Sequence, residues 1–185
     1  MDAWVWIVIA VVAIIVIVGV AYAFAKKRRH EELREQFGPE YDRAIGDAGD
    51  VRSGESELQA RRERREQLNI RPLSPDAATE YRSRWDETQR RFVDDPQGAL
   101  AEADALIVRV MRDRGYPMDD FDQRSADISV DHPDVVEHYR SAHDISARAG
   151  DDDRQVSTED LRQGLVHYRE LFARLLGSDD RRATA

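Results

Sequence analysis

The first thirty residues constrain the fold of this 185-residue chain more than any other segment does. Residues 4–25 include no charged side chain, and the basic residues 26–29 follow them directly. A helix that crosses the hydrocarbon core of a bilayer needs roughly 20 apolar residues. We therefore expect residues 1–25 to form a single N-terminal transmembrane helix.

Aromatic and basic side chains flank the apolar run, as expected where a helix leaves a bilayer. The candidate membrane-interface residues are Trp4, Trp6, Tyr22, Lys26, Lys27, Arg28 and Arg29. A cleaved signal peptide is the alternative, but it requires a basic start and a shorter apolar core, whereas the chain begins Met1-Asp2. Because basic residues are retained in the cytoplasm, we expect a single-pass protein whose C-terminal domain is cytoplasmic.

The same segment suggests two kinds of contact. The basic cluster serves as a topology signal alone, or it also attracts the anionic lipids of the bilayer. Gly19 and Ala23 have the spacing of a small-xxx-small pair, which would let two such helices pack closely as a homodimer.

The rest of the chain is acidic, and this excludes one class of partner. The formal net charge is −9, from 37 Asp and Glu against 28 Lys and Arg. Nucleic acids are bound by neutralising their phosphates with basic side chains, so we expect no nucleic-acid partner. The absence of cysteine agrees with a reducing compartment.

Proline, glycine and capping residues divide the remaining sequence into helices, with no alternating strand pattern. We expect residues 26–70 to contain the basic segment, a flexible glycine-rich spacer at 46–54 and a polar helix. Residues 71–177 predict a soluble bundle of about four main amphipathic helices, and 178–185 a disordered tail. Helix boundaries are expected at the N-caps Ser74 and Asp95, the glycine cap Gly115, an Asp131-His132-Pro133 start, and a capping box formed by Ser157 and Asp160. The predicted fold class is therefore all-α.

Four arginines crowd the polar helix at positions 61, 62, 64 and 65. Such a run indicates a solvated helix face. The alternative is a docking site for an acidic partner, which includes the acidic domain of the same chain.

The chain lacks the patterns on which common catalytic and metal sites depend. It has no Gly-x-Ser-x-Gly or phosphate-binding glycine motif, and no Glu-x-x-His pair of the kind that binds metal in helical bundles. We therefore expect no enzyme activity, no metal and no cofactor.

His143 is the candidate sensor residue, because it borders the apolar stripe of its helix one turn beyond Tyr139. The simpler interpretation is a histidine packed in the core, and the alternative is a group that faces a ligand or responds to pH. The aromatic residues have the same two interpretations, as core or as the lining of a ligand pocket; they are Tyr81, Trp85, Phe92, Tyr139, Tyr168 and Phe172.

Residues 37–176 resemble an uncharacterised family of bacterial single-span membrane proteins with a cytoplasmic helical domain. The resemblance rests on five segments, at residues 37–41, 70–73, 91–96, 114–117 and 129–133. It implies a location in the bacterial inner membrane, but no activity and no site residues.

We interpret the sequence as that of a membrane-tethered helical interaction or scaffold domain with an unknown protein partner. The expected contact surface is formed by the third and fourth helices with the acidic loop 150–155, and the connection 117–133 is a second choice. The alternative function is a membrane-anchored module that senses a small ligand or pH through His143.

Overall fold

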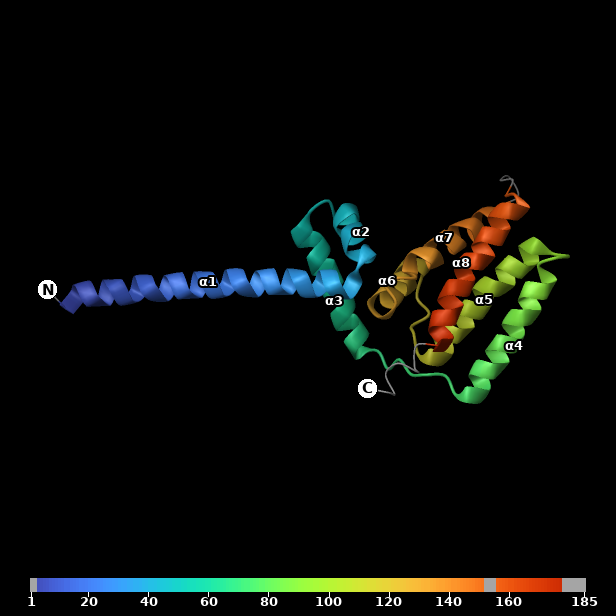
Figure 1. Ribbon diagram of the computed structural model, residues 1–185, viewed down its shortest axis with the longest axis horizontal. Helices are drawn as coiled ribbons and strands as arrows, with labels where there is room; N and C mark the ends of the chain where they lie inside the picture. The colour runs from blue at the N-terminus through green and yellow to red at the C-terminus, as the bar shows by residue number, and fades with distance from the viewer. Residues whose placement is uncertain (1–2, 152–155, 178–185) are drawn as a thin grey trace. The chain divides into compact units, whose positions relative to one another are not determined.

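The computed structural model describes residues 3–151 and 156–177 (Figure 1). Within these ranges the protein is all-α, with eight helices and no strand. The helices are α1 (Ala3–Phe37), α2 (Pro39–Ala48), α3 (Val51–Gln67), α4 (Pro75–Arg91), α5 (Pro96–Arg114), α6 (Phe121–Asp131), α7 (Val136–Ala149) and α8 (Thr158–Gly177). The chain divides into an N-terminal unit, residues 1–58, and a C-terminal unit, residues 59–185.

The structure corrects the prediction of a transmembrane helix at residues 1–25. The apolar run and the basic cluster belong to α1, which continues as one helix into the charged segment that follows. In the described part of the chain, no helix combines the length and the apolar character that crossing a bilayer requires.

This correction also contradicts the single-pass membrane assignment. The prediction that residues at the ends of the apolar run lie at a membrane interface depended on that assignment. Trp4 and Tyr22 are exposed on α1. Lys27 and Arg28 form ion pairs with Glu31 and Glu32, one helical turn further on. Arg29 is exposed, and the side chains of Trp6 and Lys26 lie outside the described residues.

The predicted flexible spacer at residues 46–54 is also wrong. α2 and α3 are separated only by a tight turn, in which Gly49 adopts a positive φ of 78°. Gly54 lies inside α3 and packs on Ile45, so closely that a Cβ atom there would be 2.8 Å from the Ile45 Cα. The glycine at 54 therefore permits close helix packing rather than flexibility.

The N-terminal unit is held by a small core. Its buried apolar side chains come from α1, α2 and α3, and they are Leu33, Phe37, Tyr41, Ala44 and Leu58. The unit ends inside α3 rather than at residue 70, the predicted end of the segment before the bundle.

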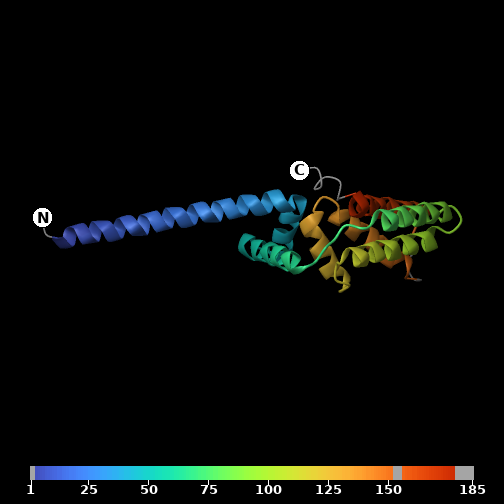
Figure 2. The same ribbon diagram turned by 90° about the horizontal axis from the view of Figure 1, so that it is seen from below.

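The C-terminal unit is built around α5, which packs against α4, α7 and α8, while α7 and α8 lie side by side (Figures 1 and 2). α5 presents a continuous buried stripe, and its members are Leu100, Ala103, Leu106, Ile107, Val110 and Met111. Apolar residues of the other helices close over this stripe, including Trp85, Ile128, Tyr139, Leu165, Tyr168 and Phe172. Most of the predicted aromatic set is therefore core.

Local capping chemistry sets most of the helix ends as predicted. Ser74 Oγ accepts from the Ala77 amide at 3.2 Å, and Asp95 accepts from the Gly98 amide at 2.9 Å. Ser157 and Asp160 form the reciprocal capping box, with both amide–side-chain distances at 3.1 Å. These bonds satisfy amides that a helix leaves without partners at its N-terminus.

The predicted start of the third long helix at Asp131 is wrong, because α6 ends there and α7 begins at Val136. The Asp131 carboxylate does not cap a helix. It accepts hydrogen bonds from Arg65 at 2.5 Å and from the Tyr116 hydroxyl at 2.9 Å. The Asp131 side chain is therefore bound by residues that are distant in the sequence, whereas the local sequence pattern predicted that it caps a helix.

Candidate functional site

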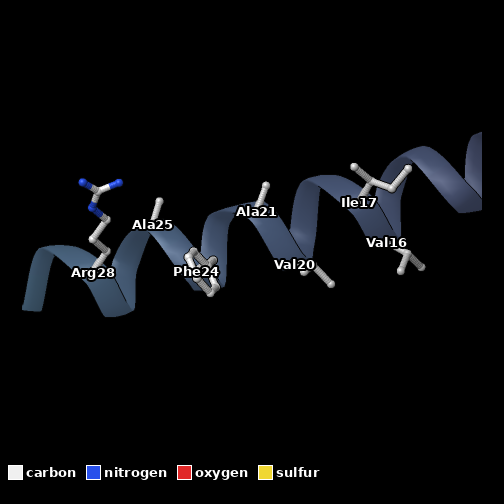
Figure 3. A pocket seen from close by; sticks show the side chains of 7 residues that line it. All are labelled: Val16, Ile17, Val20, Ala21, Phe24, Ala25 and Arg28. Carbon is white, nitrogen blue, oxygen red and sulfur yellow. The ribbon is translucent and has the colours of Figure 1, made fainter. Parts of the chain in front are cut away.

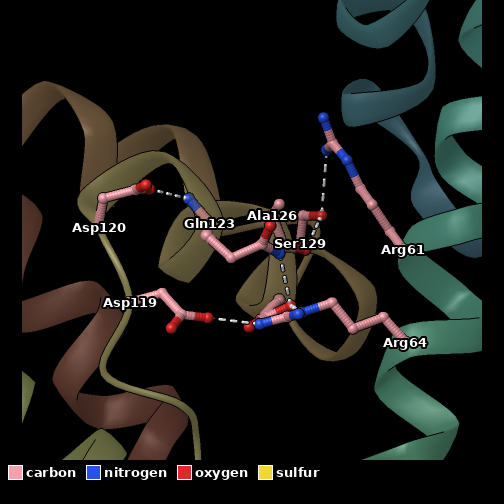
Figure 4. A network of polar contacts seen from close by, with 8 residues as sticks. Arg61, Arg64, Asp119, Asp120, Gln123, Ala126 and Ser129 are labelled. Atoms are coloured by element: carbon pink, nitrogen blue, oxygen red, sulfur yellow. Dashed lines mark hydrogen bonds and ion pairs between the residues drawn. The ribbon is translucent and has the colours of Figure 1, made fainter.

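The arginine run on α3 contacts the acidic residues of α6 and of the segment before it (Figure 4). Arg64 donates to Asp127 at 2.9 Å and to Asp119 at 2.5 Å. Arg61 donates to the Ser129 hydroxyl at 3.3 Å. The segment thus docks on the chain's own acidic domain, as the alternative interpretation of the run proposed.

This docking covers one of the two surfaces that the sequence offered for a partner. The connection 117–133 contains α6, and its carboxylates Asp119, Asp127 and Asp131 are already bound by arginines. The other surface included the acidic loop 150–155, of which residues 152–155 lie outside the described residues.

His143 is packed rather than open to a ligand. Its ring stacks on Phe121, with centroids 3.6 Å apart and planes inclined by 10°. Its Nδ1 lies 3.9 Å from an Asp104 carboxylate oxygen, which is ion-pair range but beyond a hydrogen bond. About a third of its side chain is exposed, at 34%. The contacts join α6, α7 and α5, so they support the simpler interpretation of His143.

Asp104 is the polar centre beneath His143. Tyr168 on α8 donates its hydroxyl to the Asp104 carboxylate at 2.6 Å. Burial raises the pKa of Asp104, but the interactions with His143 and Tyr168 outweigh burial and leave this pKa below its usual value. The carboxylate therefore stays ionised and ties α5 to α7 and α8.

The N-terminal unit holds a polar cluster that sequence reasoning missed. His30 Nδ1 lies 2.6 Å from a Glu55 oxygen, and the Tyr41 hydroxyl donates to the same oxygen at 2.9 Å. Burial and the neighbouring Glu55 carboxylate raise the pKa of Tyr41 to about 12. The cluster links α1, α2 and α3, and the sequence carried no spacing signal for it, because its members are brought together only by the packing.

α1 presents an apolar strip along one side (Figure 3). The strip is formed by residues of this helix alone, which are Val16, Ile17, Val20, Ala21, Phe24, Ala25 and Arg28. A single helix supplies no opposing wall, and nothing in the structure shows what covers the strip. We therefore assign it no ligand.

The candidate site is a groove of about 380 Å³ between α4 and α8. Its floor is formed by Trp85 and Phe172, whose rings are stacked with centroids 4.5 Å apart and planes inclined by 19°. Both side chains are nearly buried by the helices, at 4% and 5% exposed. The groove extends past Leu176 to the end of α8.

Two arginines form the rim of this groove. Arg82 on α4 is exposed and makes no ion pair with any residue that the structure describes. Within the part of the chain that the structure describes, Arg169 on α8 pairs only with its neighbour Glu170, at 3.3 Å and with both side chains about half exposed. Exposed pairs of this kind contribute little energy, so both guanidinium groups remain available to an incoming anion.

The sequence contained a signal for the groove that pattern reasoning passed over. Arg82 stands three residues before Trp85, and Arg169 stands three residues before Phe172. Residues three apart share a helix face, so each helix presents one arginine beside one aromatic ring. Trp85 and Phe172 therefore belong to the buried core and also line this groove.

Across the described residues, no group of three or more potential ligands lies within reach of one metal ion. In comparisons with known proteins, no family model, curated protein or solved structure matches the chain. The resemblance to an uncharacterised bacterial family therefore stays a prediction.

Proposed function

We propose that the C-terminal unit is a protein-interaction module whose groove between α4 and α8 binds a short acidic segment of a partner protein. The observation that carries this proposal is the combination of an aromatic floor, Trp85 on Phe172, with the arginines Arg82 and Arg169 at the rim. Tryptophan and arginine are the residue types that most often dominate binding energy at protein interfaces.

The charge of the groove selects the partner's chemistry. The chain as a whole carries a net charge of −9, and several arginines of the C-terminal unit form ion pairs with carboxylates. Among the described residues, Arg82 has no such partner, and Arg169 has only its exposed neighbour Glu170. A carboxylate can accept two parallel hydrogen bonds from a guanidinium group. An Asp or Glu of the bound segment would therefore replace the water around the two arginine side chains with a charged hydrogen-bond acceptor.

The size of the groove argues for a peptide segment with one anchoring side chain. A cavity of about 380 Å³ lies near the lower end of the range of roughly 300–1,000 Å³ that small-molecule pockets occupy. It accepts one large apolar side chain on the aromatic floor, with carboxylates on either side reaching the arginines. A globular surface without such a protruding anchor would not fill it.

The experiment is selection of random peptides displayed against the full chain, followed by affinity measurement of the selected peptides. The proposal expects acidic peptides with a single aromatic or branched apolar anchor. The double variant Arg82→Gln/Arg169→Gln should bind them at least tenfold more weakly, which is about 1.4 kcal/mol.

The matched control is Arg109→Gln/Arg112→Gln, which removes the same charge from exposed positions on α5. Its affinity should stay within about twofold of the unaltered chain once screening by salt is matched. Selection of basic or uncharged peptides, or equal weakening by both double variants, would overturn the assignment of the groove.

A further inference from the structure

His138 on α7 and His167 on α8 face each other across the interface between these helices. Their Nδ1 atoms are 2.8 Å apart, and their rings stack with centroids 5.0 Å apart and planes inclined by 28°. Both side chains are only partly buried. At this distance a single hydrogen lies between the two nitrogens, so one ring donates and the other accepts.

The chemistry of imidazole limits how many protons this pair can hold. A first added proton binds the free Nε2 of the donating ring, and the Nδ1–H to Nδ1 hydrogen bond survives with a charged donor. A second added proton has only the accepting Nδ1 left to bind. It would place two hydrogens in the gap of 2.8 Å and two positive charges side by side.

The charged groups on the helices that pack against α7 and α8 do not remove this conflict. Burial and the charge of His138 lower the pKa of His167, while Glu170 on the same helix opposes them. On α5, Asp104 is directed to Tyr168 and His143. On α6, Arg124 donates to the Tyr139 hydroxyl.

We propose that His138 and His167 form an acid-sensitive latch between α7 and α8, which stays closed with one added proton and opens with the second. In the unfolded chain both histidines take up a proton near about pH 6.5. The folded unit holds one proton fewer while the latch is closed. Its unfolding equilibrium constant should therefore rise about tenfold for each pH unit below about 6 through this pair alone. The latch does not depend on what occupies the groove.

The direct test follows the Cε1–H signals of the histidines by NMR in the full chain, from about pH 8 to about pH 5, the range in which imidazole titrates. EDTA is present throughout. The unaltered chain should show His167 titrating below its ordinary value. In His138→Gln, which keeps a polar side chain but no second charge, the midpoint of His167 should rise by at least about half a unit.

His143→Gln is the matched control, since it removes a histidine of α7 that faces Phe121 instead. It should leave the His167 midpoint unchanged. In urea unfolding below about pH 6, the unfolding equilibrium constant of His138→Gln should rise by a factor about ten smaller for each pH unit than that of the unaltered chain. A His167 midpoint at its ordinary value, or one that does not change in His138→Gln, would refute the latch.

Discussion

Arg64 on α3 donates its Nε–H to the carboxylate of Asp127 on α6 at 2.9 Å, and the Asp127 side chain is only 1% exposed. The same carboxylate also accepts from the Gln123 amide at 3.0 Å. The arginine is 39% exposed, so water partly screens this pair. The contact fastens the second half of α3 to the bundle.

Removal of this arginine should destabilise the C-terminal unit. Arg64→Ala leaves the buried Asp127 carboxylate with one neutral donor, and we expect a loss of about 1–2 kcal/mol, less than for a fully buried pair because of the exposure. Urea unfolding at neutral pH measures it. Arg62→Ala is the matched control, because Arg62 lies on the same helix without an ion pair to any described residue, and it should change stability by less than about 0.5 kcal/mol. Equal effects of the two variants would contradict a specific stabilising role of the Arg64–Asp127 ion pair.

His132 should make the stability of the C-terminal unit decrease as the pH falls below about 6.5. Burial lowers the pKa of His132 to about 4, against an ordinary value of about 6.5. Because the folded pKa is the lower one, the folded unit binds fewer protons, and its stability is full above about pH 6.5 and falls as the pH drops toward about 4. The gap corresponds to a loss of about 3 kcal/mol at roughly 1.4 kcal/mol per unit.

The measurement is the free energy of unfolding between about pH 7 and about pH 4, the window in which a buried histidine is linked to folding. His132→Asn should flatten the profile over this window. The comparison with His143→Gln separates His132 from other histidines, since His143 lies against Phe121 and Asp104. A profile as steep in His132→Asn as in the unaltered chain would show that other groups cause the loss.

The hydroxyl of Tyr168 should matter more than that of Tyr81, although each donates to an aspartate. Tyr168 donates to Asp104, whose side chain is 27% exposed. Tyr81 donates to Asp113, which is exposed to solvent and can exchange this bond for water. We expect Tyr168→Phe to cost about 1–2 kcal/mol and Tyr81→Phe less than about 0.5 kcal/mol. Thermal unfolding of both variants checks the order, and a larger effect at Tyr81 would contradict it.

Sequence patterns predicted the features that depend on a few neighbouring residues. The caps at Ser74 and at Ser157 with Asp160 act over three residues, and the structure has them as predicted. The groove and the contact between the arginine run and α6 depend on residues that are far apart in the sequence. Arg64 and Asp127, for example, are 63 positions apart. The sequence offered the docking of the arginine run only as an alternative and did not single out the groove, because no local pattern fixes which distant surfaces meet.

The glycines at 46 and 54 show the same limit and permit a decisive test. Both lie in a segment whose composition indicated a flexible spacer, yet Gly46 has open space around its Cα, and Gly54 packs on Ile45. Gly46→Ala should stabilise α2 by up to about 1 kcal/mol, because alanine is the better helix former. Gly54→Ala should instead destabilise the N-terminal unit by about 1–3 kcal/mol, since the added Cβ would be 2.8 Å from backbone that cannot yield like a side chain. Hydrogen exchange of the α2 and α3 amides in the full chain reports both changes locally. A flexible spacer would give weak amide protection and nearly equal, small effects for the two substitutions, whereas packed helices require effects of opposite sign.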